Sequence, residues 1–243
     1  MRLLVTRPQE DAERFARALT ELGHEAVISP LLDVQIRSEP IDLDGVGALI
    51  FTSVNGLRAF VANCNERRLP VYAVGDRTAA AARTAGFPDV RSAAGDVEAL
   101  SAKIAGTWQP SAGVLLHAAG VRTAGDLAGR LGAAGFSLRR RTLYDARPAE
   151  ALPEAAHTAL QRGKVDAVAF FSPRTASTFV RLVRLSGLER STHGLSALCL
   201  SPAVANEADA LTWADVRVAE KPTEAALLAT LDGSRQTEQQ TGQ

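Results

Sequence analysis

The sequence has few of the residues and motifs that hold metals, nucleotides or disulfides. Its 243 residues include two cysteines, which lie in opposite halves, and four histidines without metal-ligand spacing. This pattern excludes a disulfide framework and gives no support for a zinc site. The sequence also has no glycine-rich phosphate motif and no Gly-x-Ser-x-Gly turn. Nucleotide binding and serine-hydrolase chemistry are therefore unsupported.

Long apolar runs and an excess of charge of one sign are also missing. No segment approaches the roughly 18 apolar residues of a membrane helix. Lys+Arg and Asp+Glu number 27 each, so the net charge is zero and nothing suggests a nucleic-acid binder. The first apolar run is short and is followed at once by an arginine and a proline, unlike a signal peptide. We expect a cytoplasmic protein with no nucleic-acid or membrane partner.

What the sequence does contain is an internal repeat. Three stretches of the first half recur in the second half, and the best kept are turns from a strand to a helix. A duplicated chain builds two similar lobes, and ligands usually bind between domains. The matched pairs include Leu3-Leu4 with Leu115-Leu116, Phe51-x-Ser53 with Phe170-x-Ser172, and Asp89-Val90-Arg91 with Asp215-Val216-Arg217.

Short β-forming runs alternate with amphipathic helices along both halves. Apolar residues at helical spacing predict a helix over about 12–22, after a buried strand at 3–5. Such alternation indicates an α/β fold with parallel sheets covered by helices on both faces. We expect further strands at 26–28, 48–51, 71–74, 114–116, 138, 167–171, 198–200 and 216–218, and further helices around 57–61, 78–84 and 98–104.

Two equivalent segments, 31–38 and 142–149, break this alternation and look extended. We expect them to pair antiparallel and to join two interleaved lobes as a two-stranded β-ladder. Lobe 1 would hold residues 1–33 and 149–243, lobe 2 would hold residues 40–140, and the ladder would hold 34–39 and 141–148. The polar, glutamine-rich stretch 234–243 is expected to be disordered.

Small hydroxyl side chains gather where the predicted strands meet helices. Free N–H groups and the helix dipole make such turns good anion sites, beyond the strand carboxyl ends where ligands of parallel sheets bind. Each serine or threonine alone is best explained as a helix cap worth about 1 kcal/mol. Several such turns in matched pairs favour an anionic ligand. The candidate residues are Thr52, Ser53, Asn55, Gly75, Thr78, Ser172, Pro173, Arg174, Ser201 and Thr223.

Tyr144 follows three consecutive arginines at 139–141, which we interpret as a solvated surface. By the ladder hypothesis this tyrosine would lie at the hinge, next to the cleft. A tyrosine there is either a packing residue with a hydrated hydroxyl or a proton donor. The residues alone leave both alternatives open.

The order and spacing of several short motifs resemble the uroporphyrinogen-III synthase family, up to about Leu231. The resemblance implies two α/β lobes joined by a β-ladder. It also implies dehydration and closure of the linear tetrapyrrole hydroxymethylbilane to uroporphyrinogen III, with ring D inverted and without a metal or organic cofactor. The motifs are Leu4-Val5-Thr6-Arg7-Pro8, Phe51-Thr52-Ser53, Val74-Gly75-x-x-Thr78-Ala79, Tyr144, Phe171-Ser172-Pro173 and Pro222-Thr223.

The resemblance also implies roles for single residues. Tyr144 matches the family's tyrosine and would assist hydroxide departure as a general acid, and Arg7 lies in a motif that would contact the substrate. Where many members have Arg-Gly, this chain has His117-Ala118-Ala119-Gly120, so Arg122 or a hydrogen bond from His117 would replace the missing arginine. In the turn after Ser201, a valine replaces the family's threonine.

No long exposed apolar stripe suggests a partner surface, so we expect a monomer with transient contact to the enzyme that supplies hydroxymethylbilane. The main rival is a non-catalytic bilobal binding protein for an anionic small molecule, although such proteins normally carry an export signal. A structural or regulatory protein with a degenerate site is the second rival.

Overall fold

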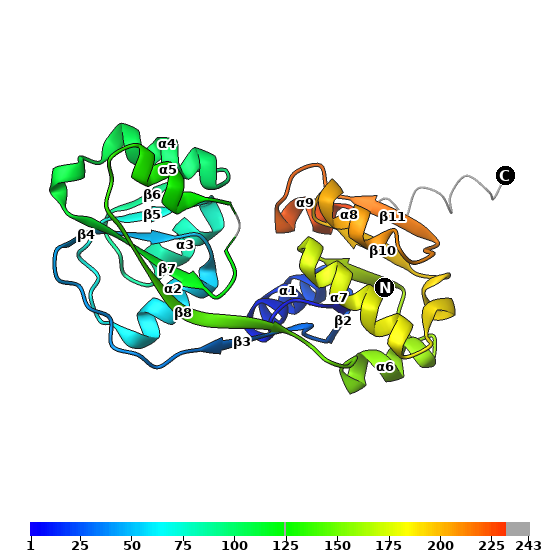
Figure 1. Cartoon of the computed structure of the whole chain (residues 1–243). Helices are drawn as coiled ribbons and strands as arrows, with labels where there is room; N and C mark the ends of the chain where they lie inside the picture. The colour runs from blue at the N-terminus through cyan, green and yellow to red at the C-terminus, as the bar shows by residue number, and fades with distance from the viewer. Residues whose placement is uncertain (124, 232–243) are drawn as a thin grey trace. The chain divides into compact units, whose positions relative to one another are not determined.

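The computed structural model describes residues 1–123 and 125–231, and the chain forms two compact units. Unit 1 combines Met1–Asp33 with the chain from Arg147 onward, and unit 2 is Val34–Ala146. The chain therefore leaves unit 1 after Asp33 and re-enters it at Arg147 (Figure 1). The segment 234–243, expected to be disordered, lies outside the described residues.

Unit 1 contains a five-stranded parallel sheet in the order β11-β10-β9-β1-β2. Successive side chains of a strand point to opposite faces. Leu3 of β1 therefore packs with α1 and α9, whereas Leu4 packs with α6, α7 and α8. The elements are β1 (Arg2–Val5), α1 (Gln9–Glu21), β2 (Glu25–Ile28), α6 (Glu154–Gln161), β9 (Ala167–Phe170), α7 (Pro173–Leu185), the 3₁₀ turn η2 (Glu189–Thr192), β10 (Ser196–Cys199), α8 (Pro202–Ala208), β11 (Asp215–Val218) and α9 (Glu224–Ala229).

Unit 2 is built around a six-stranded sheet in the order β3-β8-β7-β4-β5-β6, in which the strands from β8 to β6 are parallel. Phe51 of β4 packs with α2 and α3 on one face, and Ile50 packs with α4 and α5 on the other. The elements are β3 (Leu32–Ile36), β4 (Val46–Phe51), α2 (Val54–Asn63), β5 (Val71–Ala73), α3 (Asp76–Thr84), β6 (Val90–Ser92), α4 (Val97–Thr107), the 3₁₀ turn η1 (Pro110–Ala112), β7 (Val114–Gly120), α5 (Leu127–Ala133) and β8 (Leu138–Pro148).

Strands β3 and β8 are neighbours, and both run across the boundaries of the two units. The N–H of Arg37 donates to the carbonyl of Leu143 at 2.8 Å, and the N–H of Ala149 donates to Leu31 at 2.9 Å. Along the first segment the residue number rises from 31 to 37 while that of its bonded partner falls from 149 to 143, which is the antiparallel pattern. The expectation of an isolated strand at 138 and a separate extended segment at 142–149 is wrong. They form one strand, because the three arginines between them continue the pairing with β7.

The predicted fold class is confirmed: two α/β units each have parallel strands with helices on both faces (Figure 1). Apart from the division of β8, each predicted strand overlaps an observed one, but several helices begin earlier than their apolar periodicity indicates. Helix α1, for example, begins at Gln9. Its first turn is polar, so the apolar periodicity does not reveal this start. Within residues 1–123 and 125–231, no helix combines the length and apolar character that crossing a bilayer requires.

Candidate functional site

The carboxyl ends of β8, β7, β4 and β5 lie next to one another in unit 2, because these strands are parallel neighbours. In a parallel sheet this edge is where ligands bind. The edge brings together candidates that the sequence separates by up to about 90 residues. They are Thr52, Ser53 and Asn55 after β4, Gly75 and Thr78 after β5, His117 and Gly120 on β7, and Tyr144 on β8.

Tyr144 and Ser53 form the first polar pair of this edge. The phenol oxygen of Tyr144 lies 2.9 Å from Ser53 Oγ, at hydrogen-bond distance. Ser53 is also the N-cap of α2, where its Oγ accepts from the N–H of Gly56 at 3.0 Å. The cap and the phenol contact are therefore made by the same hydroxyl. Tyr144 is an integral part of β8, paired with Gly120 of β7, and its side chain is half-buried against the apolar core that contains Phe51 and Phe60.

Thr52 and His117 form the second pair, with Thr52 Oγ1 2.9 Å from His117 Nε2. His117 is 3% exposed. Burial, together with the nearby positive charge of Arg140, lowers the pKa of His117 to about 4. The imidazole is therefore neutral near pH 7. It can share a hydrogen bond with Thr52, but it carries no positive charge that could replace the arginine expected from the family resemblance.

Arg140, expected to lie on a solvated surface, is a charged residue of this edge. Its Nη2 donates to the carbonyl oxygens of Gly120 at 2.6 Å and Val121 at 3.0 Å. The residue is in register with His117 across β7 and β8. Reading residues 138–148 as one continuous strand would have placed Arg140 beside His117. The expected break at the three arginines concealed this pairing.

The buried His117 gives a testable pH dependence of stability. Its folded pKa of about 4 lies below its ordinary value of 6.5. Between pH 6.5 and pH 4 the imidazole is therefore protonated in the unfolded chain but not in the folded chain. We expect this group to remove roughly 3 kcal/mol of unfolding free energy as the pH falls from 6.5 to 4, and nothing above that window.

The measurement is chemical denaturation at several pH values for the wild type and for His117→Gln. Glutamine keeps a polar side chain near Thr52 but cannot titrate, so its stability should fall less steeply between pH 6.5 and 4. The exposed His193 provides the matched control, and His193→Gln should keep the wild-type slope. Equal slopes for the wild type and His117→Gln would contradict the assignment.

The other unit 2 candidates lie near this edge without joining the two pairs. Asn55 occupies the first turn of α2, and Gly75 is the N-cap of α3 without a side-chain cap. Thr78 is 5% exposed within the first turn of α3. Arg122 is exposed on the segment after β7. Their predicted contacts with substrate stay predictions.

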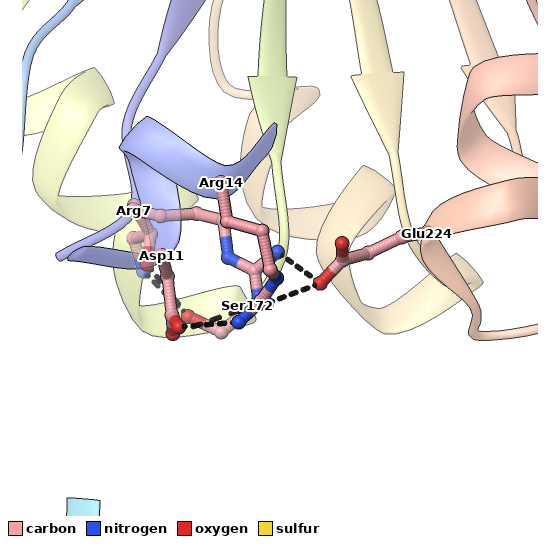
Figure 2. A network of polar contacts seen from close by, with 6 residues as sticks. Arg7, Asp11, Arg14, Ser172 and Glu224 are labelled. Carbon is pink, nitrogen blue, oxygen red and sulfur yellow. Dashed lines mark hydrogen bonds and ion pairs between the residues drawn. The ribbon is translucent and has the colours of Figure 1, made fainter. Parts of the chain in front are cut away.

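In unit 1, Arg7 follows β1 and is the centre of an ionic network (Figure 2). Its side chain is 3% exposed and pairs with Asp11 at 3.7 Å and Glu224 at 2.6 Å. Its guanidinium carbon also lies 4.1 Å from the centre of the Phe171 ring. Arg14 contacts the same Glu224 oxygen at 2.8 Å. Arg7 therefore joins the ends of β1 and β9 to α9, and a direct contact with substrate would require this network to open.

Charge and burial compete at Glu224. Burial raises the pKa of its carboxyl, but the hydrogen bonds and charges of Arg7 and Arg14 outweigh burial, and the net pKa is lowered. Asp11 and Arg14 are three residues apart within α1, a spacing that places two side chains on the same face of a helix, whereas Arg7 precedes the helix. Glu224 lies 217 residues from Arg7, so no local pattern could indicate it.

The hydroxyl turns of unit 1 act as helix caps in two of three cases. Ser172 caps α7 by accepting from Thr175 N–H at 3.2 Å, and Thr223 caps α9 by accepting from Ala226 N–H at 3.2 Å. Ser201 stands at the N-cap of α8 without a side-chain cap bond. The side-chain cap expected there is not formed, and the N–H groups of Val204 and Ala205 donate to the Ser201 backbone carbonyl.

Val204 shows how one departure from the family pattern is accommodated. Val204, which replaces the expected threonine, is 1% exposed in the apolar core on the α8 side of the sheet. It therefore packs and offers nothing to a ligand. Pro173 is the first residue of α7 and is exposed, and Arg174 beside it is half-buried. Both lie next to the cap Ser172.

Comparison with known proteins identifies this architecture. A profile described as "Uroporphyrinogen-III synthase HemD" matches residues 13–229. The chain belongs to the uroporphyrinogen-III synthase family. This confirms the family prediction, and members of the family are hydro-lyases. No curated protein sequence matches the chain significantly.

Two solved structures of uroporphyrinogen-III synthases are similar to the chain. The enzyme of Helicobacter pylori is 17% identical with a TM-score of 0.67, and the alignment covers 96% of this chain and 99% of that one. A mutant of the Thermus thermophilus enzyme is 18% identical with a TM-score of 0.54, covering 97% and 99%. At this identity the likeness shows a shared fold. It supports the family's bilobal α/β architecture for this chain.

Proposed function

We propose that this chain converts hydroxymethylbilane to uroporphyrinogen III, with loss of water and inversion of ring D, in tetrapyrrole biosynthesis. The observation that carries the proposal is the Tyr144–Ser53 hydrogen bond of 2.9 Å at the carboxyl edge of the unit 2 sheet. It puts a phenol, the candidate proton donor, beside the N-terminus of α2 in a chain of this family. Thr52 and the neutral His117 add further polar groups at that edge.

The ligand class follows from the donors. Hydroxymethylbilane is a polycarboxylate, and helix N-termini attract carboxylates through free N–H groups and the helix dipole. Helix α2 has 10 residues and α7 has 13, and both begin at serine caps that follow a strand of a parallel sheet. We propose that these turns bind substrate carboxylates. The transfer of binding roles to Asn55, Gly75, Thr78, Arg122, Ser201 and Thr223 belongs to the same proposal.

The chemistry needs a proton more than it needs a strong nucleophile. Departure of hydroxide from the hydroxymethyl group, protonated to water as it leaves, gives a cationic azafulvene. The substituted carbon of ring D attacks this cation, and the resulting spiro intermediate fragments and recloses with ring D inverted. Tyr144 is the proposed general acid for the first step, a role that contributes typically 10²–10⁴-fold.

Selection of the inverted isomer is a matter of geometry. Closure in solution gives the uninverted ring, so the protein must hold the chain with the disfavoured carbon in reach. This is catalysis by orientation and by complementarity to the transition state. Polar groups on rigid strand ends suit that task, because β4, β7 and β8 fix Thr52, His117 and Tyr144 to one sheet. We propose that the chain works as a monomer that meets the hydroxymethylbilane-producing enzyme transiently.

The test is incubation of the purified chain with hydroxymethylbilane, oxidation of the products and separation of the isomers. Uroporphyrin III should dominate over the type I isomer that forms spontaneously. Binding that leaves type I as the dominant product would overturn the enzymatic proposal and favour the binding-protein alternative. If the chain neither binds hydroxymethylbilane nor forms the type III product, the result would favour the degenerate-site alternative.

A further inference from the structure

Gly120 lies directly under the ring of Tyr144. The two residues are paired across β7 and β8, at a point where the register shifts between Ala119 and Gly120. The N–H of Val121 donates to the carbonyl of Tyr144 at 3.0 Å, which fixes the β8 backbone there. A methyl group at position 120 would lie 2.7 Å from Tyr144 Cζ, 2.9 Å from Cε2 and 3.0 Å from the hydroxyl oxygen. The ring therefore occupies the space of the missing side chain.

Space, and not backbone conformation, explains the glycine at this position. Gly120 is absent from the glycines with positive φ, so its backbone is one that other residues adopt. Gly56 gives an instructive contrast, because a methyl group there would meet the backbone oxygen of Ala118 at 2.4 Å. That glycine lets α2 approach β7. At Gly120 the obstacle is the far end of a side chain, which can rotate away.

The other end of the phenol is held by Ser53. One lone pair of Ser53 Oγ accepts from Gly56 N–H at 3.0 Å, which fixes the serine rotamer. The same oxygen lies 2.9 Å from the Tyr144 hydroxyl. A serine hydroxyl has one proton and two lone pairs, so Ser53 can donate to the phenol oxygen while it caps α2. The Tyr144 proton is then available to a bound molecule.

We propose that Gly120 is a positioning residue for Tyr144: its missing side chain lets the ring lie against β7, where Ser53 holds the hydroxyl. The inference rests on the proposed role of Tyr144 as general acid. Gly120 was a substrate-contact candidate from sequence, and the geometry assigns it a different role. Displacing a proton donor by about 1 Å can lower the rate on the order of 10²-fold, so the position of the Tyr144 ring between Gly120 and Ser53 matters for turnover.

The experiment compares Gly120→Ala with Gly132→Ala. Gly132 lies in α5, has no positive φ, and would place a methyl group in open space. Gly132→Ala should keep wild-type turnover. Gly120→Ala should rotate the Tyr144 ring off Ser53 and reduce kcat by up to about 10²-fold, the loss expected for Tyr144→Phe, with little change in KM.

A double mutant separates positioning from a general packing defect. If Gly120 acts through the phenol, Gly120→Ala should add no further loss of kcat in a Tyr144→Phe background. A second readout is the ¹⁹F spectrum of fluorotyrosine-labelled protein in a Tyr72→Phe background, where Tyr144 is the one remaining tyrosine of the two in the chain. Its resonance should move in Gly120→Ala and stay unchanged in Gly132→Ala.

The outcomes are distinguishable. Full activity and an unmoved resonance in Gly120→Ala would overturn this inference, while a slow Tyr144→Phe would leave the proposed function intact. Full activity of Tyr144→Phe would instead remove the general-acid role on which the inference rests. If Gly120→Ala does not fold, Ser53→Ala and Ser53→Thr test the same positioning of the Tyr144 hydroxyl. Threonine keeps the hydroxyl, so it should restore the kcat that alanine loses, and equal kcat in both would contradict the positioning role.

Discussion

Tyr144→Phe is expected to lower the turnover of hydroxymethylbilane by about 10²-fold, at the low end of the range for a general acid. Phenylalanine keeps the ring against Gly120 and removes only the hydroxyl that contacts Ser53 at 2.9 Å. The substrate carboxylates do not depend on that hydroxyl in our proposal, so KM should change little. The measurement is the initial rate of uroporphyrinogen III formation with the isomers separated.

The chain contains its own control for this experiment. Its other tyrosine, Tyr72, is buried in β5 and makes hydrogen bonds to Thr107 at 3.0 Å and Arg91 at 2.8 Å. Tyr72→Phe removes a buried hydroxyl of the same kind away from Ser53, so it should cost some stability and leave kcat unchanged. If Tyr144→Phe turns over as fast as Tyr72→Phe, Tyr144 is not the acid.

Arg7→Ala should produce the largest loss of stability, about 3 kcal/mol of unfolding free energy. The reason is the buried partner: the Asp11 side chain is 7% exposed and would lose the guanidinium 3.7 Å away. Removing one member of a buried ion pair typically costs about 3–5 kcal/mol, because it leaves an uncompensated charge. The low end applies, because Arg14 still pairs with Glu224 and with Asp11.

Urea denaturation at pH 7 measures this effect, and Arg2→Ala is the matched control. Arg2 also forms an ion pair in unit 1, to Glu25 at 3.6 Å, but the two side chains are 42% and 78% exposed. Exposed pairs contribute about 0–1 kcal/mol, so Arg2→Ala should be nearly neutral. A loss in Arg7→Ala no larger than in Arg2→Ala would show that the buried network contributes no net stability.

The sheets and helices could be predicted because parallel strands are buried on both faces and must be continuously apolar. Leu3-Leu4-Val5 and Leu49-Ile50-Phe51 are such runs, and the structure makes them central strands. The exception was β8, whose three arginines conceal a strand near the edge of the sheet. Their side chains reach acceptors such as the Asp42 carboxylate and the backbone carbonyl of Gly120, so charge there is compatible with a strand.

The candidate site could be predicted as a set of residues but not as a set of contacts. Hydroxyls at strand ends are visible in any sequence, and the capping bonds of Ser53, Ser172 and Thr223 are local, three residues long. The contacts that distinguish a site from a row of caps are not local. Ser53 and Tyr144 are separated by 91 residues.

By itself, the sequence determined that this is an α/β chain with small hydroxyls at its strand ends, because burial periodicity and capping are properties of neighbouring residues. Only the tertiary structure decided that Ser53 meets Tyr144, that His117 is neutral beside Thr52, and that Arg7 is enclosed by Asp11 and Glu224. Strand order sets which ends become neighbours, and burial sets which groups keep their charge. Both are fixed only when the whole sheet has formed.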